Sequence, residues 1–278
     1  MSLSPSQSRT RPELVAYFGL VFLLSWGIEV PLALSARGVI DLRVPFALHY
    51  LAPFGPFAAA VIVTLAARGV SGLGKLLGGL VKWKVGRTYA LFAVVSPVVV
   101  FAGIVLVTAI LQGSWPDLAL LGQVDYLPYI GAAPALALWM LTFGMGEEVG
   151  WRGFALPRLQ KGRTASSASL LLGAFWATWH LPALFYRDTY LEMGLVVIPM
   201  LITIAVVGSI VYTWLYNGTQ GSLLMLVVFH GLFDFFSVWP AGIIGPGVVM
   251  TVLMVFWAVR VYRLYGPVNL APEAKIVL

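Results

Sequence analysis

The chain has 278 residues, of which 60% are hydrophobic and only 10% are charged, and its mean hydropathy is +0.93. A soluble domain carries roughly 25% charged residues, so this chain has too few polar side chains to cover a surface that faces water. It has no cysteine, which excludes disulfides, thiol catalysis and thiolate metal ligands. The net charge of +6 comes without a basic stripe interleaved with aromatic residues. We therefore expect the lipid bilayer, and no nucleic acid, as a partner.

Apolar runs recur along the chain at the length that a helical membrane crossing requires, roughly 20 residues. They predict an all-α polytopic membrane protein with about eight transmembrane helices around a polar intramembrane cavity. The expected spans are 14–35, 46–67, 88–111, 129–156, 166–186, 193–216, 221–238 and 241–263. The predicted organisation is a polar N-terminal tail (1–13), an eight-helix domain (14–266) and a short C-terminal end (267–278).

The basic residues lie mostly on one side of these spans. With the N-terminus inside, only Arg37, Arg43 and Arg187 of the 17 basic residues fall in outer segments. Because Lys and Arg concentrate in cytoplasmic segments, we expect a multi-pass protein with both termini in the cytoplasm. The stretch GVSGLGKLLGGLVKWKVGR (69–87) is typical of a partly amphipathic segment at the cytoplasmic membrane surface, with anchoring at anionic head groups as its simplest role.

Ionisable residues inside membrane spans are rare and usually functional, because each costs at least ~2.5–3.5 kcal/mol near the bilayer centre. In this chain they form three groups, one each on the fourth, fifth and seventh spans: Glu147, Glu148 and Arg152; His180; and His230 and Asp234. At ~1.5 Å per residue, Glu147, His180 and His230 lie roughly 15, 21 and 13 Å from the cytoplasmic ends of their spans. Similar depths predict that the three groups meet around one polar cavity, open more readily to the cytoplasm.

Spacing within each group suggests roles. Glu148 and Arg152 are four residues apart, on one helix face, and pairing is what a buried arginine requires. Glu147 points about 100° away from Glu148, which leaves its carboxylate able to face a cavity. His230 and Asp234 are also four apart, so Asp234 can fix the tautomer of His230.

Each group also has a purely structural interpretation. Glu148 with Arg152 is an ion pair that makes the helix tolerable in lipid, and His230 with Asp234 can equally be a packing pair. His180 alone can be an interhelical hydrogen-bonding residue. We expect His49 to lie at the membrane interface and Glu29 at the interface or in the cavity lining. Glu147 has no local partner, which makes it the hardest of these residues to explain structurally.

Three short motifs occur in a fixed order: EEVGWR (147–152), WATWH (176–180) and HGLFD (230–234). This order resembles the pattern of the CPBP intramembrane proteases, which include CAAX prenyl endopeptidases, bacteriocin-processing enzymes and Abi proteins. That pattern has two glutamates shortly before an arginine, then Phe-x-x-x-His, then His-x-x-x-Asn or Asp. The resemblance spans about residues 140–240 and includes the eight-helix layout.

The resemblance implies a glutamate-dependent endopeptidase. It assigns Glu147 as the base that activates a water and His180 as a group that holds that water. It assigns His230 and Asp234 to oxyanion stabilisation or, in an alternative account, to metal binding. Glu148 and Arg152 match supporting positions.

Two positions depart from the family pattern. The second motif has Trp176 where the family has phenylalanine, and we expect Trp176 and Trp179 to line the substrate pocket. Asp234 stands where eukaryotic prenyl proteases have asparagine, and an ionised aspartate cannot donate a hydrogen bond to an oxyanion. Asp234 must then orient His230, be protonated or bind a metal.

The expected activity is hydrolysis of a peptide bond in a membrane-tethered or lipidated, CAAX-like protein or peptide. We expect no metal cofactor, with Zn²⁺ on Glu147, His180 and His230 as the alternative, since zinc catalysis takes three protein ligands and an open site. A proton-coupled transporter would also bury such groups, but it should show repeat symmetry, which we do not find. A non-catalytic scaffold or immunity protein would tolerate the loss of Glu147.

Overall fold

The structure, a computed structural model, describes residues 5–123, 129–242 and 245–278. All regular elements in these ranges are helices, and none of the described residues lies in a strand. The longer helices are α1 (Pro5–Ala36), α2 (Phe54–Gly78), α3 (Arg87–Gln112), α7 (Ala165–Trp179), α9 (Val197–Val206), α10 (Gly208–Gly218), α11 (Leu223–Ser237) and α12 (Pro246–Asn269). Shorter pieces are η1 (Phe46–Leu51), η2 (Gly79–Val81), η3 (Leu118–Leu120), α4 (Ala132–Trp139), η4 (Met140–Met145), α5 (Gly146–Glu148), η5 (Val149–Ala155), α6 (Leu156–Leu159), η6 (Leu181–Phe185), α8 (Asp188–Met193) and η7 (Gly194–Val196).

Each of the eight predicted spans coincides with a helical segment. Six segments are long and apolar enough to cross a membrane: Thr10–Ala36, Phe46–Val81, Arg87–Gln112, Ala165–Phe185, Asp188–Gly218 and Pro246–Asn269. The other two are the shorter apolar helix Leu223–Ser237 and the run from α4 to α6, which alternates between α- and π-helical turns. The prediction of an all-helical polytopic membrane protein is therefore confirmed.

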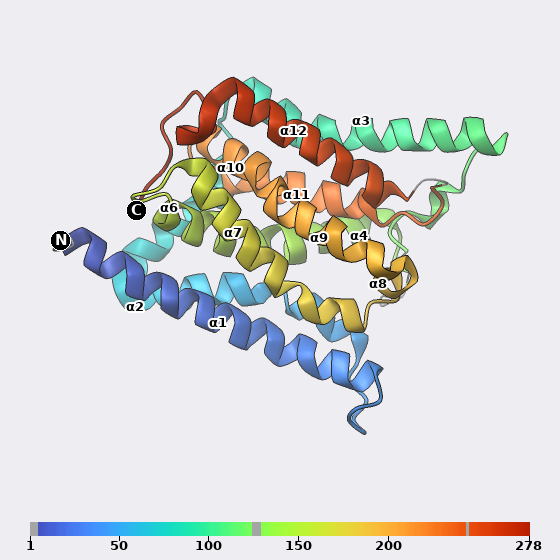
Figure 1. Ribbon diagram of the computed structural model, residues 1–278, viewed down its shortest axis with the longest axis horizontal. Coiled ribbons are helices and arrows are strands. Elements are labelled where there is room, and N and C mark those ends of the chain that lie inside the picture. The colour runs from blue at the N-terminus through green and yellow to red at the C-terminus, as the bar shows by residue number, and fades with distance from the viewer. Residues whose placement is uncertain (1–4, 124–128, 243–244) are drawn as a thin grey trace.

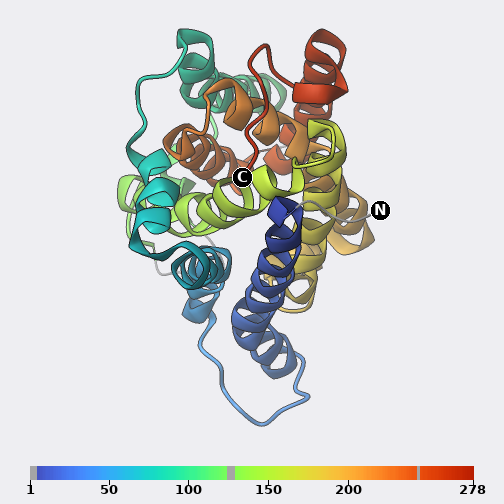
Figure 2. The same cartoon turned by 90° about the vertical axis from the view of Figure 1, so that its left-hand side faces the viewer.

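Both ends of the chain lie at the same end of the helix bundle (Figures 1 and 2). An even number of crossings requires this arrangement. Helix α1 begins at Pro5 and so takes in residues that we assigned to the polar tail, while residues 1–4 lie outside the described residues. Glu13 holds this part of α1 in place, because its carboxylate accepts hydrogen bonds from Arg158 and Arg68.

The run from α4 to α6 lies inside the bundle, between α2 and α11, and glycines allow the close approach. A Cβ on Gly146 would lie 2.7 Å from the carbonyl oxygen of Pro53, and one on Gly150 would lie 2.5 Å from that of Pro56. On the other side, a Cβ on Gly144 would meet the carbonyl oxygen of Val227 at 2.7 Å. Small residues thus bring the backbone around the first motif against two neighbouring helices.

Apolar side chains cover the outer faces of the peripheral helices. Large examples on α1, α3 and α12 are Val15, Leu23, Val99, Ile110, Val252 and Phe256, each more than half exposed. A water-soluble protein rarely shows apolar surface on this scale, whereas a bilayer solvates it favourably.

Candidate active site

The first motif lies on a π-helical stretch of the buried run. Two π-helical pieces, η4 and η5, flank the single α-helical turn that carries Glu147 and Glu148. Single π turns inside helices occur frequently at functional sites, because the wider turn shifts the register of the following side chains. Both glutamates and Arg152 are buried.

Glu148 and Arg152 form the ion pair that their spacing predicts. Arg152 Nη1 donates to Glu148 Oε1 at 2.8 Å, and Nη2 donates to Ser209 Oγ on α10 at 3.2 Å. The guanidinium lies between two aromatic rings, 4.4 Å from the centroid of Trp176 and 4.2 Å from that of Tyr212. Aromatic faces and a carboxylate replace the water that a fully buried guanidinium loses.

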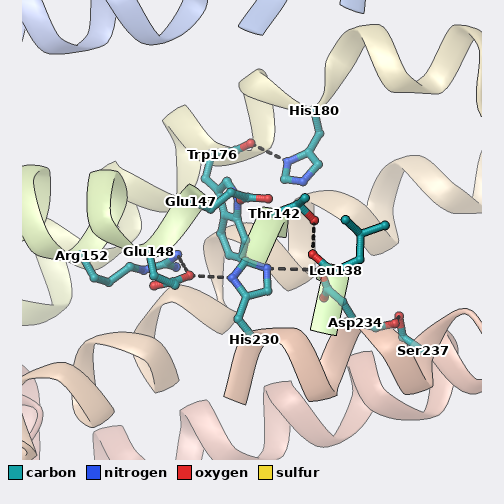
Figure 3. Close-up of polar contacts among 10 residues, drawn as sticks. All are labelled: Leu138, Thr142, Glu147, Glu148, Arg152, Trp176, His180, His230, Asp234 and Ser237. Carbon is teal, nitrogen blue, oxygen red and sulfur yellow. Dashed lines mark hydrogen bonds and ion pairs between the residues drawn. The ribbon is translucent and has the colours of Figure 1, made fainter. Parts of the chain in front are cut away.

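His230 joins this ion pair to Asp234 (Figure 3). Its Nδ1 lies 2.7 Å from Glu148 Oε1, and its Nε2 lies 3.2 Å from Asp234 Oδ2. A ring protonated on both nitrogens satisfies both contacts, because ionised carboxylates only accept hydrogen bonds. The predicted His230–Asp234 contact is confirmed, and the contact with Glu148 links the first motif to the third.

The side chain of Glu147 contacts the second motif. The indole Nε1 of Trp176 on α7 donates to Glu147 Oε2 at 2.6 Å, with both side chains buried. Figure 3 shows the Glu147 carboxylate pointing towards the space that His180 and His230 border. A phenylalanine at position 176 has no N–H and could not make this bond.

His180 ends α7 and presents one ring nitrogen. Its Nδ1 lies 2.8 Å from the carbonyl oxygen of Trp176. A carbonyl only accepts, so Nδ1 carries the proton, and in the neutral ring Nε2 is then left as an acceptor. The helix ends here because Pro182 follows and a short 3₁₀ turn takes over.

A cavity of about 670 Å³ borders this cluster. Its polar wall contains Trp176, His180, Tyr212, His230 and Asp234, and about a third of the Asp234 side chain is exposed. Its apolar lining includes Met200, Leu201 and Ile204 on α9 and Phe233 on α11. A largely apolar space with a few convergent polar groups is typical of a ligand-binding site.

Three details differ from the expectations. Trp179 does not line this cavity, since it packs behind His180, with ring centroids 4.7 Å apart. Glu147, only 1% exposed, lies one layer behind the lining residues. The cavity extends to the loops around α8 and before α12, at the end opposite the termini, whereas we expected access from the end that carries the termini.

The three candidate zinc ligands do not form a ligand set. Within residues 5–123, 129–242 and 245–278, no group of three or more His, Asp or Glu side chains lies close enough to hold a metal ion. Glu147 bonds Trp176 and both ring nitrogens of His230 contact carboxylates, so of the three residues only His180 presents a ring nitrogen without such a contact. The residues therefore do not fit a catalytic zinc site, which needs three converging protein ligands.

Ser209, Tyr212 and the donor role of Trp176 were not anticipated from the sequence. Helix α10 does carry a signal for such contacts, because Ser209, Thr213 and Asn217 recur every four residues within an apolar helix and all are buried. Ser209 accepts a hydrogen bond from Arg152, and Thr213 accepts one from Ser169. Asn217 donates one to Gln160. A polar stripe on one face of a membrane helix indicates a face that packs against other polar groups.

Glu29 and His49 belong to a separate buried cluster near α1. The hydroxyl of Tyr186 donates to Glu29 Oε1 at 3.1 Å and lies 2.6 Å from His49 Nδ1. His49 lies on η1, close to the start of the span Phe46–Val81, and its side chain is buried among protein groups.

Comparison with known proteins assigns a family to the part of the chain that carries all three motifs. Residues 129–236 match the family described as type II CAAX prenyl endopeptidase Rce1-like. We call residues 129–236 the Rce1-like segment, after this match. The CAAX prenyl protease 2 of Methanococcus maripaludis is 30% identical over 124 residues, and the match covers 40% of this chain and 40% of that relative. The resemblance drawn from the three motifs is confirmed, and the Rce1-like segment contains every candidate catalytic residue.

Proposed function

We propose that the chain is an intramembrane endopeptidase that hydrolyses a peptide bond in a membrane-tethered or lipidated protein. The observation that carries this proposal is the meeting of the three motifs at one cavity within the Rce1-like segment, with a buried carboxylate, Glu147, held by Trp176. The name of the similar archaeal protein supports a CAAX-like substrate, a peptide with a lipidated cysteine near its C-terminus.

In the proposed reaction Glu147 removes a proton from a water that enters from the cavity. The water oxygen attacks the scissile carbonyl carbon, and Glu147 later returns the proton to the leaving amine as the C–N bond breaks. Trp176 keeps the Glu147 carboxylate in one orientation. The acceptor Nε2 of His180 orients the water from the other side.

His230 is the proposed donor to the developing oxyanion. Its contact with Asp234, at 3.2 Å, is longer than its contact with Glu148, at 2.7 Å, so it is the contact that a substrate oxygen would exchange. Asp234 orients His230 before the substrate binds, and Glu148 keeps its contact with Nδ1 when the substrate oxygen takes the place of Asp234. Donors placed where negative charge develops contribute about 2.7–4 kcal/mol each in comparable enzymes.

The apolar side of the cavity would take the apolar part of the substrate. Met200, Leu201 and Ile204 on α9 line the same cavity as the polar groups His180, His230 and Asp234. This combination suits a substrate whose peptide carries a lipid or an apolar tail.

A comparison of membrane-protein termini in the native host tests the proposal. Cells would express the wild type or Glu147→Ala at equal levels. New protein ends that vanish in the variant would support proteolysis and name the substrate. Identical termini in both strains, with both proteins folded, would contradict the proposal.

A further inference from the structure

A second cavity, of about 330 Å³, lies at the end of the bundle that carries both termini. It opens where α2 is broken at Gly69, whose φ of 64° is not helical. Figure 2, which faces this end, shows the second half of α2 turning across the bundle. The remaining walls come from η5 and α6, the turn between α10 and α11, and the C-terminal segment. The space is separate from the candidate active site and shares no lining residue with it.

The lining of this second cavity is positively charged. Arg68, Lys75 and Arg158 all contribute to it, and none of its described lining residues is acidic. Glu13 contacts two of these three cations. Its Oε2 accepts a hydrogen bond from Arg158 Nε at 2.7 Å and one from Arg68 Nη2 at 3.3 Å. Among the side chains, one carboxylate therefore faces three cations.

A buried hydroxyl in the same lining has no partner. Thr64 is 3% exposed, and its Oγ1 makes no hydrogen bond to any described residue. Ser71 and Tyr216 add two further hydroxyl-bearing side chains to the lining. An unsatisfied buried polar group is costly, so a ligand that accepts a hydrogen bond would relieve that cost.

The chain beside this cavity carries apolar side chains at the surface. Val70, Val81 and Trp83 are all more than two-thirds exposed, and Lys82 and Lys84 flank the tryptophan. Exposed apolar residues and tryptophan next to lysines are typical of a segment at the membrane–water interface. The cavity therefore lies at the depth of lipid head groups.

We propose that this cavity binds the phosphate group of an anionic phospholipid. Arg68 and Lys75 supply charge to the phosphate, Thr64 donates its unpartnered hydroxyl, and the apolar surface at Val70 and Val81 borders the acyl chains. Basic pockets between membrane helices bind anionic head groups through the same chemistry. The site is independent of the proposed peptidase activity.

The test measures lipid retention by the purified full-length chain in detergent, using native mass spectrometry. The chain is incubated with phosphatidylglycerol or with phosphatidylcholine, and in a third arm with phosphatidylglycerol plus excess inorganic phosphate. We expect phosphatidylglycerol to be retained in preference to phosphatidylcholine, and inorganic phosphate to compete poorly. Equal retention of the two lipids would overturn the proposal, and efficient displacement by inorganic phosphate would assign the site to a soluble anion instead.

Matched variants separate this cavity from general surface charge. Lys75→Gln should lower phosphatidylglycerol retention about fivefold, the effect of losing one lysine near an anionic head group. Lys84→Gln removes the same charge from the same surface segment, outside the cavity lining, and should leave retention unchanged. If both variants lose the same amount of phosphatidylglycerol retention, the proposal of a specific site in this cavity is overturned.

Thr64→Val provides a second variant that does not depend on charge. It should lower retention of phosphatidylglycerol while leaving the melting temperature of the lipid-free protein unchanged or higher, because the hydroxyl has no protein partner. Unchanged retention would remove Thr64 from the site.

Discussion

The indole N–H of Trp176 donates a 2.6 Å hydrogen bond to the carboxylate of Glu147, and both side chains are buried. The same ring lies 4.4 Å from the guanidinium carbon of Arg152. One tryptophan therefore contacts both the proposed base and the ion pair beside it. The family pattern has phenylalanine at this position, so this chain holds its glutamate with a group that the pattern does not provide.

Trp176→Phe tests this relationship. The substitution keeps an aromatic ring but removes the N–H, and a hydrogen bond to a charged group is worth about 1.5–3 kcal/mol. We expect kcat/KM to fall about 10- to 100-fold, with a lower melting temperature as well because the buried Glu147 loses its donor. Trp214→Phe is the matched control, because the Nε1 of Trp214 is buried without a described partner. Equal activities of the two variants would show that the bond to Glu147 is not used.

Arg152→Met should destabilise the protein strongly. It leaves Glu148 buried with His230 but without the guanidinium, and breaking a buried pair from one side costs about 3–5 kcal/mol. The double variant Arg152→Met with Glu148→Gln should recover part of this loss. Thermal unfolding in detergent measures both, with Arg37→Met on the exposed surface as control. If the double variant is no more stable than the single one, the uncompensated charge is not the cause.

Gly150→Ala should separate the first motif from α2. The new Cβ would lie 2.5 Å from backbone atoms of Pro56, which cannot move aside as a flexible side chain can. We expect a loss of about 1–3 kcal/mol in the free energy of unfolding. Gly74→Ala, at a helical position with nothing within 4 Å, should be neutral or stabilising by up to about 1 kcal/mol. Similar melting temperatures for both variants would contradict the close packing.

Removal of metal ions should leave the proposed activity intact. Among the described residues, no group of three or more His, Asp or Glu side chains is arranged to hold a metal ion, so no zinc ligand set is ready in the site. Activity is measured before and after dialysis against a chelator, followed by addition of Zn²⁺. Loss of activity that Zn²⁺ alone restores would contradict this prediction.

Contacts within one helix could be predicted from the sequence, and contacts between helices could not. The pairs Glu148–Arg152 and His230–Asp234 follow from the four-residue spacing, which helix geometry brings onto one face. The contacts Trp176–Glu147 and Glu148–His230 depend on how three helices rotate against each other. Hydropathy carries no information about that rotation.

The eight spans could be predicted for a similar reason, since their length and apolar content are local properties. The distance of each ionisable residue from the end of its span also predicted that the three motifs lie at a similar depth. It did not reveal which end of the bundle the cavity reaches, because that depends on loops around α8 and before α12. The π turns η4 and η5 were also missed, because the period of apolar residues does not distinguish a single π turn from the α-helix around it.

The most direct test of the central claim is cleavage of a tethered peptide by the purified chain in lipid vesicles. Wild type and Glu147→Gln are compared with a lipidated peptide that ends in a CAAX-like sequence, and products are identified by mass spectrometry. Glutamine keeps the shape of the side chain and an oxygen for the Trp176 bond, but it cannot take up the proton of water. We predict a single new peptide end with the wild type and none with Glu147→Gln at the same melting temperature. Equal cleavage by both proteins, or no cleavage of any tethered peptide by the folded wild type, would contradict the account.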